Sequence, residues 1–174
     1  MNLSLRPERP EDDKFLISLY AETRALELAA TGWSDLQKDT FLRSQFQLQR
    51  AHYRRYYPEA QFDVIEDQGR AVGRLYVHRG AEEIRVMDIA LTPEYRNRGL
   101  GGELMQRLIA EAAATSRHIS LHVEAENPAQ RLYTRLGFRE MERNGPYVLM
   151  EWQPGSVAAP RTHAADGDSG NTGE

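Results

Sequence analysis

A glycine-rich turn in the middle of the chain has residue types suited to holding phosphate. The segment TPEYRNRGLGGEL covers residues 92–104 and carries Arg96 and Arg98 just before Gly99, Gly101 and Gly102. Glycines allow backbone N–H groups to converge on phosphate oxygens, and the N-terminus of a following helix adds partial positive charge. The two arginines add formal charge. We therefore expect a pyrophosphate cradle here, and a tight turn that holds no ligand is the alternative.

Two common glycine motifs do not fit this turn. A dinucleotide fingerprint requires glycine or alanine at its third glycine position, where GLGGEL has Leu104. The phosphate-binding loop GxxxxGK followed by serine or threonine is absent from the chain. The cradle is therefore of a different kind.

Hydrophobic periodicity and capping residues predict the elements that position the turn. The spacing of leucines after the glycines is helical, and Asn127-Pro128 and Gly137 have the residue types that begin and end a helix. The predicted helices run from the acidic residues 11–13 to Gly32, from Ser34 or Asp35 to Pro58, over 100–115 and over 128–136; the predicted strands cover 62–67, 70–79, 82–92, 118–124, 138–143 and 147–152.

Length and composition limit the class of protein. A chain of 174 residues fits one domain, which we assign to residues 1–153, whereas residues 154–174 have the composition of a disordered tail. The net charge of −4 argues against nucleic-acid binding. No apolar run is long enough to span a membrane, and no signal core begins the chain, so we expect no membrane association and a cytoplasmic location. The chain has no cysteine, which excludes disulfides and a cysteine nucleophile.

Two separate motifs resemble those of the GCN5-related N-acetyltransferase (GNAT) family. Residues 96–101, Arg-Asn-Arg-Gly-Leu-Gly, match the family signature R/Q-x-x-G-x-G/A. Residues 127–129, Asn-Pro-Ala, followed by Leu132-Tyr133 and by residues 136–138, Leu-Gly-Phe, resemble its second hallmark. Their order and separation also agree. The resemblance is close over residues 62–152.

This resemblance implies a fold, an activity and a cosubstrate. The implied fold is α/β (α+β), a mixed and mostly antiparallel sheet flanked by helices, with strands splayed around the cofactor. The implied enzyme is an acyltransferase that moves the acetyl group of acetyl-CoA to a primary amine by direct attack in a ternary complex. The residues that it would use for acetyl-CoA are Ala90, Leu91, Thr92, Arg96, Arg98, Gly99, Leu100, Gly101, Gly102, Glu103, Asn127 and Tyr133.

Acyl transfer to an amine needs three further groups. Tyr133 is the expected acid for the leaving thiolate, because a phenol stays protonated at neutral pH and the family motif places it near the sulfur; packing in the core is its other role. A backbone N–H between Ile89 and Leu91 would stabilise the oxyanion. The expected base is Asp88, in an apolar strand that could raise its pKa, with Glu124 or water as alternatives. A structural carboxylate paired with arginine is the other interpretation of Asp88.

The acceptor is the least determined part of the hypothesis. Trp33 and Tyr56 are the expected substrate-binding residues, from the segment between the first two helices and from the run RAHYRRYYPEAQ, which would suit an acceptor with a carboxylate or phosphate. A solvated helix face explains that run equally well. The acceptor amine belongs to a small molecule or to a peptide or protein, and a homodimer is possible in principle. We expect no metal, since His118 and His122 lack further spaced ligands. A non-catalytic acetyl-CoA sensor or an interaction domain is the alternative function.

Overall fold

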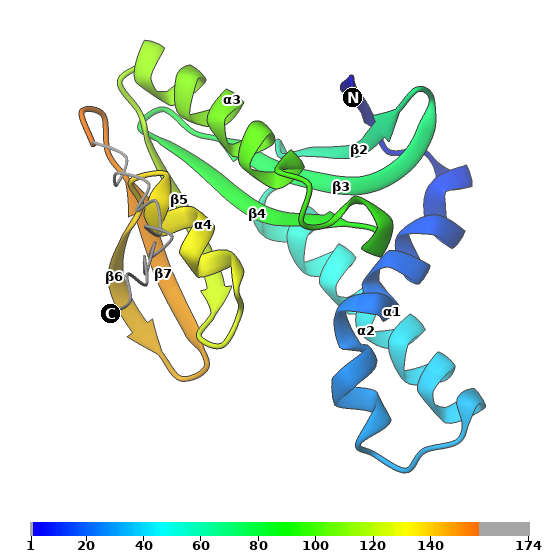
Figure 1. Cartoon of the computed structure of the whole chain (residues 1–174). Coiled ribbons are helices and arrows are strands. Elements are labelled where there is room, and N and C mark those ends of the chain that lie inside the picture. The colour runs from blue at the N-terminus through cyan, green and yellow to red at the C-terminus, as the bar shows by residue number, and fades with distance from the viewer. Residues whose placement is uncertain (1, 157–174) are drawn as a thin grey trace, which may run out of the picture.

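The computed structural model describes residues 2–156 and contains one mixed, open seven-stranded sheet flanked by four helices (Figure 1). The strand order is β1-β2-β3-β4-β5-β7-β6. The strands are β1 Leu3–Pro7, β2 Gln61–Asp67, β3 Arg70–Arg79, β4 Glu83–Leu91, β5 His118–Glu124, β6 Arg139–Asn144 and β7 Tyr147–Trp152. The helices are α1 Asp13–Ala29, α2 Asp35–Tyr56, α3 Leu100–Ala114 and α4 Ala129–Arg135, with 3-10 turns η1 Pro10–Asp12 and η2 Pro93–Tyr95.

The predicted fold class is confirmed, and each predicted helix and strand is present with small shifts at its ends. The strand β1, which pairs antiparallel with β2 at one edge of the sheet, was not predicted. Its only strong signal is the alternation of Leu3 and Leu5 over five residues, too short for periodicity to decide. Residues 157–174 of the predicted tail lie outside the described residues. Within residues 2–156, no helix is long and apolar enough to cross a membrane.

The helices cover opposite faces of the sheet. Side chains of α3 and α4, such as Leu104, Met105 and Tyr133, join the main core with Leu75 and Ile119 of the sheet. Helices α1 and α2 pack on the other face through a smaller cluster of Leu16, Tyr20, Phe46 and Val64. Figure 1 shows that the α1–α2 hairpin extends well beyond the sheet. Each helix therefore packs its apolar side against one face of the sheet.

The sheet divides where β4 and β5 separate. These two strands form the one parallel ladder found within the described residues, and it pairs Glu83–Val86 with His118–Leu121. Beyond this point β4 continues along β3, and β5 continues along β7. A bulge falls at the same place: Tyr76 pairs with Asp88 and Val77 with Val86, so Met87 is the extra residue on β4. A bulge increases the local twist of its strand. The bulge at Met87 therefore lies where the two halves of the sheet separate, and we call the opening between β4 and β5 beyond this point the splay.

Gly73 allows β3 and β4 to approach each other closely. A Cβ atom at this position would overlap the carbonyl oxygen of Ala90 and lie 2.9 Å from a Leu91 methyl carbon. Backbone cannot move aside as a flexible side chain can. We predict that Gly73→Ala lowers the free energy of unfolding by about 2 kcal/mol, seen as a lower urea midpoint.

Gly101→Ala is the matched control for this prediction. Its Cβ would meet only Leu132, at 3.8 Å, and it lies in a helix, where alanine is favoured over glycine by roughly 0.5–1 kcal/mol. The control should therefore unfold at the wild-type urea concentration or above it. A Gly73→Ala protein as stable as this control would contradict the prediction.

Candidate functional site

The glycine turn places the start of α3 directly beyond the splay of β4 and β5. The chain leaves β4, makes the 3-10 turn η2, and enters α3 through Asn97 and Gly99, whose φ angles of 57° and 78° are left-handed. Asparagine tolerates this conformation and glycine adopts it without strain. Gly99 is the residue just before the helix. The glycine at this position is thus required by the backbone itself.

The first turn of α3 offers backbone donors. In a helix the first N–H groups have no partner within it, which applies here to Leu100, Gly101 and Gly102. Glu103 differs from the expectation, because its N–H already donates to the Gly99 carbonyl at 3.0 Å and its carboxylate pairs with Arg107 at 2.5 Å. The fold does not itself demand glycine at 101, where a Cβ would find 3.8 Å of space. Glycine at this position leaves the backbone of the first turn bare.

Arg96 and Arg98 both lie exposed on the turn. The Nε of Arg96 donates to the Leu91 carbonyl at 2.8 Å, and the guanidinium of Arg98 stacks on Tyr95 with its Cζ 5.5 Å from the ring centroid. Both arginines therefore add positive charge to the turn that leads into α3, where the first N–H groups of the helix add partial positive charge.

The backbone of β4 alternates between its neighbour β3 and the open side. Thr92 donates to the Val72 carbonyl at 2.9 Å, so the antiparallel alternation directs the N–H and C=O of Thr92, Ala90 and Asp88 toward β3. Those of Ile89 and Leu91 point the other way, into the splay. Of Ala90, Leu91 and Thr92, only Leu91 turns its backbone to that side, where its N–H is free and its carbonyl already accepts from Arg96. Ala90 and Thr92 can contribute side chains alone.

Asn127 caps α4 on the far side of the splay. Its Oδ1 accepts a hydrogen bond from the Ala129 N–H at 2.9 Å, which confirms the predicted capping role. The side chain is exposed, and its amide nitrogen has no partner within residues 2–156. The amide N–H groups can therefore donate to a ligand while the oxygen caps the helix.

The end of α4 fixes Tyr133 in place. Gly137, at φ 96°, lies just past the helix; its N–H donates to the Thr134 carbonyl at 3.1 Å and the Phe138 N–H donates to the Tyr133 carbonyl at 3.0 Å. These two bonds form a Schellman motif. The rings of Tyr133 and Phe138 pack with centroids 5.7 Å apart. The predicted helix-ending glycine is confirmed, and the same motif orients the tyrosine.

Tyr133 is held in its neutral form. The residue is 6% exposed, and burial raises the pKa of its phenol to about 12, with the negative charge of Asp88 as a second cause. The phenol O–H has no hydrogen-bond partner among the described side chains and backbone groups. It is a protonated donor with its hydrogen free.

Asp88 is paired with a buried arginine that sequence reasoning missed. Its Oδ2 accepts a short hydrogen bond from Nη2 of Arg74 on β3, and Arg74 is 2% exposed. Its only trace in the sequence is its place within the apolar strand RAVGRLYVHR, where residues 72–77 are all buried. Glu124, the competing base, ends β5 with an exposed side chain.

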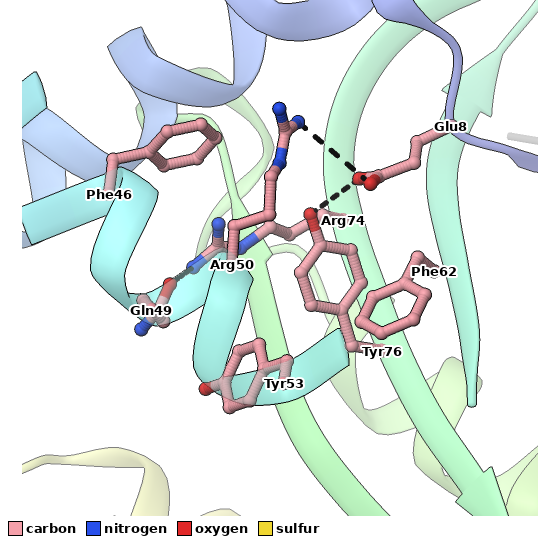
Figure 2. A pocket seen from close by; sticks show the side chains of 8 residues that line it. All are labelled: Glu8, Phe46, Gln49, Arg50, Tyr53, Phe62, Arg74 and Tyr76. Carbon is pink, nitrogen blue, oxygen red and sulfur yellow. Dashed lines mark hydrogen bonds and ion pairs between the residues drawn. The ribbon is translucent and has the colours of Figure 1, made fainter. Parts of the chain in front are cut away.

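Helix α2 covers Arg74 on its face of the sheet (Figure 2). The Tyr53 hydroxyl donates weakly to the Met87 carbonyl at 3.4 Å, so α2 reaches the bulge of β4. A cavity of about 10 Å³, room for about one water, has this lining: Glu8, Phe46, Gln49, Arg50, Tyr53, Phe62, Arg74 and Tyr76. The Tyr76 hydroxyl donates to Glu8 at 2.7 Å. Tyr53, which was not singled out from the sequence, is therefore closer to the splay than the two expected substrate residues.

Trp33 and Tyr56 are not brought together with Tyr133. Trp33 lies in the connection between α1 and α2, at the tip of the projecting hairpin, and packs edge-on against Phe41 at 5.2 Å (Figure 1). Tyr56 is the last residue of α2, 61% exposed, and packs against His52 at 4.6 Å. Within residues 2–156, no group of three or more histidine, cysteine, aspartate or glutamate side chains is placed to hold a metal ion.

Comparison with known proteins gives one consistent family. The model of the Acetyltransferase (GNAT) family matches residues 23–138. A Bacillus subtilis (strain 168) protein, named as a candidate ribosomal protein bS18 alanine N-acetyltransferase, is 30% identical over 104 residues, which cover 55% of this chain and 69% of that protein.

Two solved structures share the fold at lower sequence identity. The PaiA N-acetyltransferase of Thermoplasma acidophilum, in complex with coenzyme A, has a TM-score of 0.65 and 18% identity over 88% of this chain and 99% of its own. The protein yncA of Salmonella typhimurium, with its cofactor acetyl-CoA, has a TM-score of 0.54 and 21% identity over 94% of this chain and 100% of its own.

Proposed function

Because the chain belongs to the GNAT acetyltransferase family, we propose that it transfers the acetyl group of acetyl-CoA to a primary amine by direct attack in a ternary complex. The observation that carries this proposal is the state of Tyr133, a buried tyrosine whose helix end is fixed by the Schellman motif at Gly137 and whose phenol has no hydrogen-bond partner among the described residues. The glycine turn lies at the end of the same β4 strand.

The residues present fit acetyl-CoA along its length. The N–H groups of Leu100, Gly101 and Gly102, with Arg96 and Arg98 beside them, suit the pyrophosphate. The outward-facing backbone of Leu91, whose N–H is free and whose carbonyl accepts from Arg96, can pair with the pantetheine arm as an added strand would. Asn127 can donate its amide N–H groups from the other side. Both relatives of known structure named above were solved with coenzyme A or acetyl-CoA, which supports this assignment.

The groups at the splay suit the charge changes of acyl transfer. The N–H of Ile89 or Leu91 can stabilise negative charge on the thioester oxygen. Full proton transfer from a phenol of pKa about 12 to a thiolate whose acid has a pKa of ~8.5 is uphill by roughly 5 kcal/mol. Tyr133 therefore acts chiefly as a hydrogen-bond donor to the departing sulfur, and the proton lost by the amine completes the neutralisation. Asp88, Glu124 or water receives that proton first.

An α-amine is the acceptor that this site favours. At pH 7 about one in seven α-amines of pKa ~7.8 is neutral, against about one in 2,500 lysine side chains of pKa ~10.4. A site without a strong base reacts faster with an α-amine, because a larger fraction of it is already neutral at pH 7. The Bacillus subtilis relative is named for an alanine acceptor in a ribosomal protein, which also supports an α-amine at the N-terminus of a peptide. A small-molecule amine of similar pKa meets the same requirement.

We predict that Gly101→Val weakens acetyl-CoA binding at least tenfold, because a branched side chain would stand where phosphate meets the backbone. Calorimetry measures the affinity directly. A thermal shift gives a second measure, since ligand at 100 times its Kd should stabilise the wild-type by about 2.7 kcal/mol. Gly101→Ala controls for folding. Unchanged affinity in the valine variant would rule out the cradle.

We predict that Tyr133→Phe lowers kcat by roughly tenfold to hundredfold while acetyl-CoA affinity changes less than twofold, because only the hydroxyl is lost. The matched control is Tyr20→Phe, a tyrosine equally buried on α1 whose hydroxyl accepts a hydrogen bond from Arg24. Wild-type kcat in Tyr133→Phe, with chemistry shown to limit the rate, would leave Tyr133 a packing residue.

An acceptor screen tests the proposed function itself. CoA release is followed with two peptides, one with a free α-amine and no lysine, the other with a blocked N-terminus and one lysine. We predict that kcat/KM at pH 7 is roughly a hundredfold higher for the α-amine, and that the ratio narrows toward pH 9 as lysine loses its proton. Equal rates at pH 7 would refute the acceptor class.

The screen also separates the alternative functions. A non-catalytic sensor would be stabilised by acetyl-CoA yet release no CoA with any amine. An interaction domain would show no stabilisation by acetyl-CoA at all.

A further inference from the structure

The most deeply buried charge in the neighbourhood of the splay is Arg74. Its residue is 2% exposed, on β3 beneath α2. Burial acts to lower the pKa of the guanidinium, but the charge of Asp88 and the neighbouring Tyr76 and Tyr53 outweigh this effect, and the pKa is raised. Arg74 is therefore a full positive charge inside the protein.

Stability does not explain this buried charge. Nη2 donates to Asp88 and, at 3.2 Å, to Gln49, whereas Nε and Nη1 are buried without a hydrogen-bond partner among the described residues. The ring of Tyr76, 5.0 Å from Cζ, gives partial compensation. A buried ion pair with missing hydrogen bonds is frequently less stable than hydrophobic residues of the same volume. A reason for Arg74 has to be sought in what its charge does to Asp88.

The Asp88 carboxylate has one oxygen engaged and one oxygen available. Oδ2 accepts from Arg74, while Oδ1 has no hydrogen-bond partner among the described residues and is not among their buried unpartnered atoms. The Asp88 side chain is 18% exposed. Oδ1 is thus accessible.

The groups around Asp88 leave Arg74 as its closest charge. They come from every element packed against it: Arg74 and Tyr76 from β3, Tyr53 from α2 and Tyr133 from α4. Arg85, on the same strand, donates to Ser120 and contacts His122 instead.

We propose that Arg74 is a positioning residue that keeps Asp88 ionised, with Oδ1 free at the splay to accept an N–H of the acceptor amine. The inference rests on the proposed acetyltransferase function. A partly buried carboxylate that loses its counter-charge becomes harder to ionise, and a protonated Asp88 no longer accepts the amine proton. The charge of Arg74 thereby sets the lowest pH at which the site works.

The experiment compares pH profiles of kcat/KM for one α-amine peptide in the wild-type, Arg74→Met, Arg74→Lys, Asp88→Asn and the double variant Arg74→Met with Asp88→Asn. On a logarithmic scale the profile has slope one where only the amine titrates and slope two where Asp88 titrates as well. Because the same peptide amine is used in every assay, a difference between variants in the pH of the slope change must come from the protein.

We predict that Arg74→Met moves the slope change upward by about one pH unit, lowers kcat/KM about tenfold at pH values below both slope changes, and alters acetyl-CoA affinity less than twofold. Arg74→Lys should recover most of the loss, because it keeps the charge. Adding Arg74→Met to Asp88→Asn should reduce kcat/KM by less than twofold further, since the carboxylate is already gone. The control Arg79→Met removes a β3 arginine that pairs with Glu111 on the molecular surface, and its profile should be that of the wild-type.

Three results would overturn the inference. The slope change could stay at the wild-type pH in Arg74→Met. The loss of kcat/KM caused by Arg74→Met could be as large in the Asp88→Asn protein as in the wild-type. Arg74→Lys could have a kcat/KM as low as that of Arg74→Met. If Arg74→Met does not fold, the double variant, which buries no unpaired charge, is compared with Asp88→Asn, and Arg74→Lys with the wild-type. A wild-type that binds acetyl-CoA but acetylates no amine would instead overturn the proposed function, and this inference with it.

Discussion

The structure depends on the point where the parallel ladder between β4 and β5 ends, after Val86 and Leu121. Up to that point the strands share hydrogen bonds, and beyond it each strand keeps only its other neighbour. The backbone of Ile89 and Leu91 is left facing outward as a result. An edge of this kind inside a sheet is expensive unless something pairs with it. In the proposed function the extended arm of the cosubstrate supplies that pairing, and the glycine turn, Asn127 and Tyr133 are the groups that would hold and use it.

The elements of the fold could be predicted because each has a local signal. Helix periods, the cap at Asn127 and the left-handed glycine at Gly137 act over a few residues, and the structure confirms them. The strand β1 has no comparable signal, because five residues with two leucines at a chain end look like a loop. The parallel ladder is also invisible locally, since it joins residues more than thirty positions apart.

The location of the site in the chain could be predicted from the sequence, but not which of its backbone and side-chain groups are free. Motif positions located the turn and Tyr133, but which carbonyls of residues 89–92 face outward depends on the register with β3, and the commitment of the Glu103 amide depends on where α3 begins. Arg74 could not be assigned from the sequence, because an arginine in a strand is usually solvated and only the position of α2 buries it. Trp33 was selected for its residue type, which says nothing of the length of the hairpin that carries it away.

The Schellman motif has a consequence for how this helix can change over time. The orientation of Tyr133 is set by Gly137 and Phe138, through backbone bonds and ring packing, whereas Arg131, Thr134 and Arg135 of the same helix are exposed. Substitutions at those three positions leave the phenol where it is. The outer surface of the helix can therefore change in sequence while Gly137 and Phe138, which follow it, preserve the orientation of Tyr133.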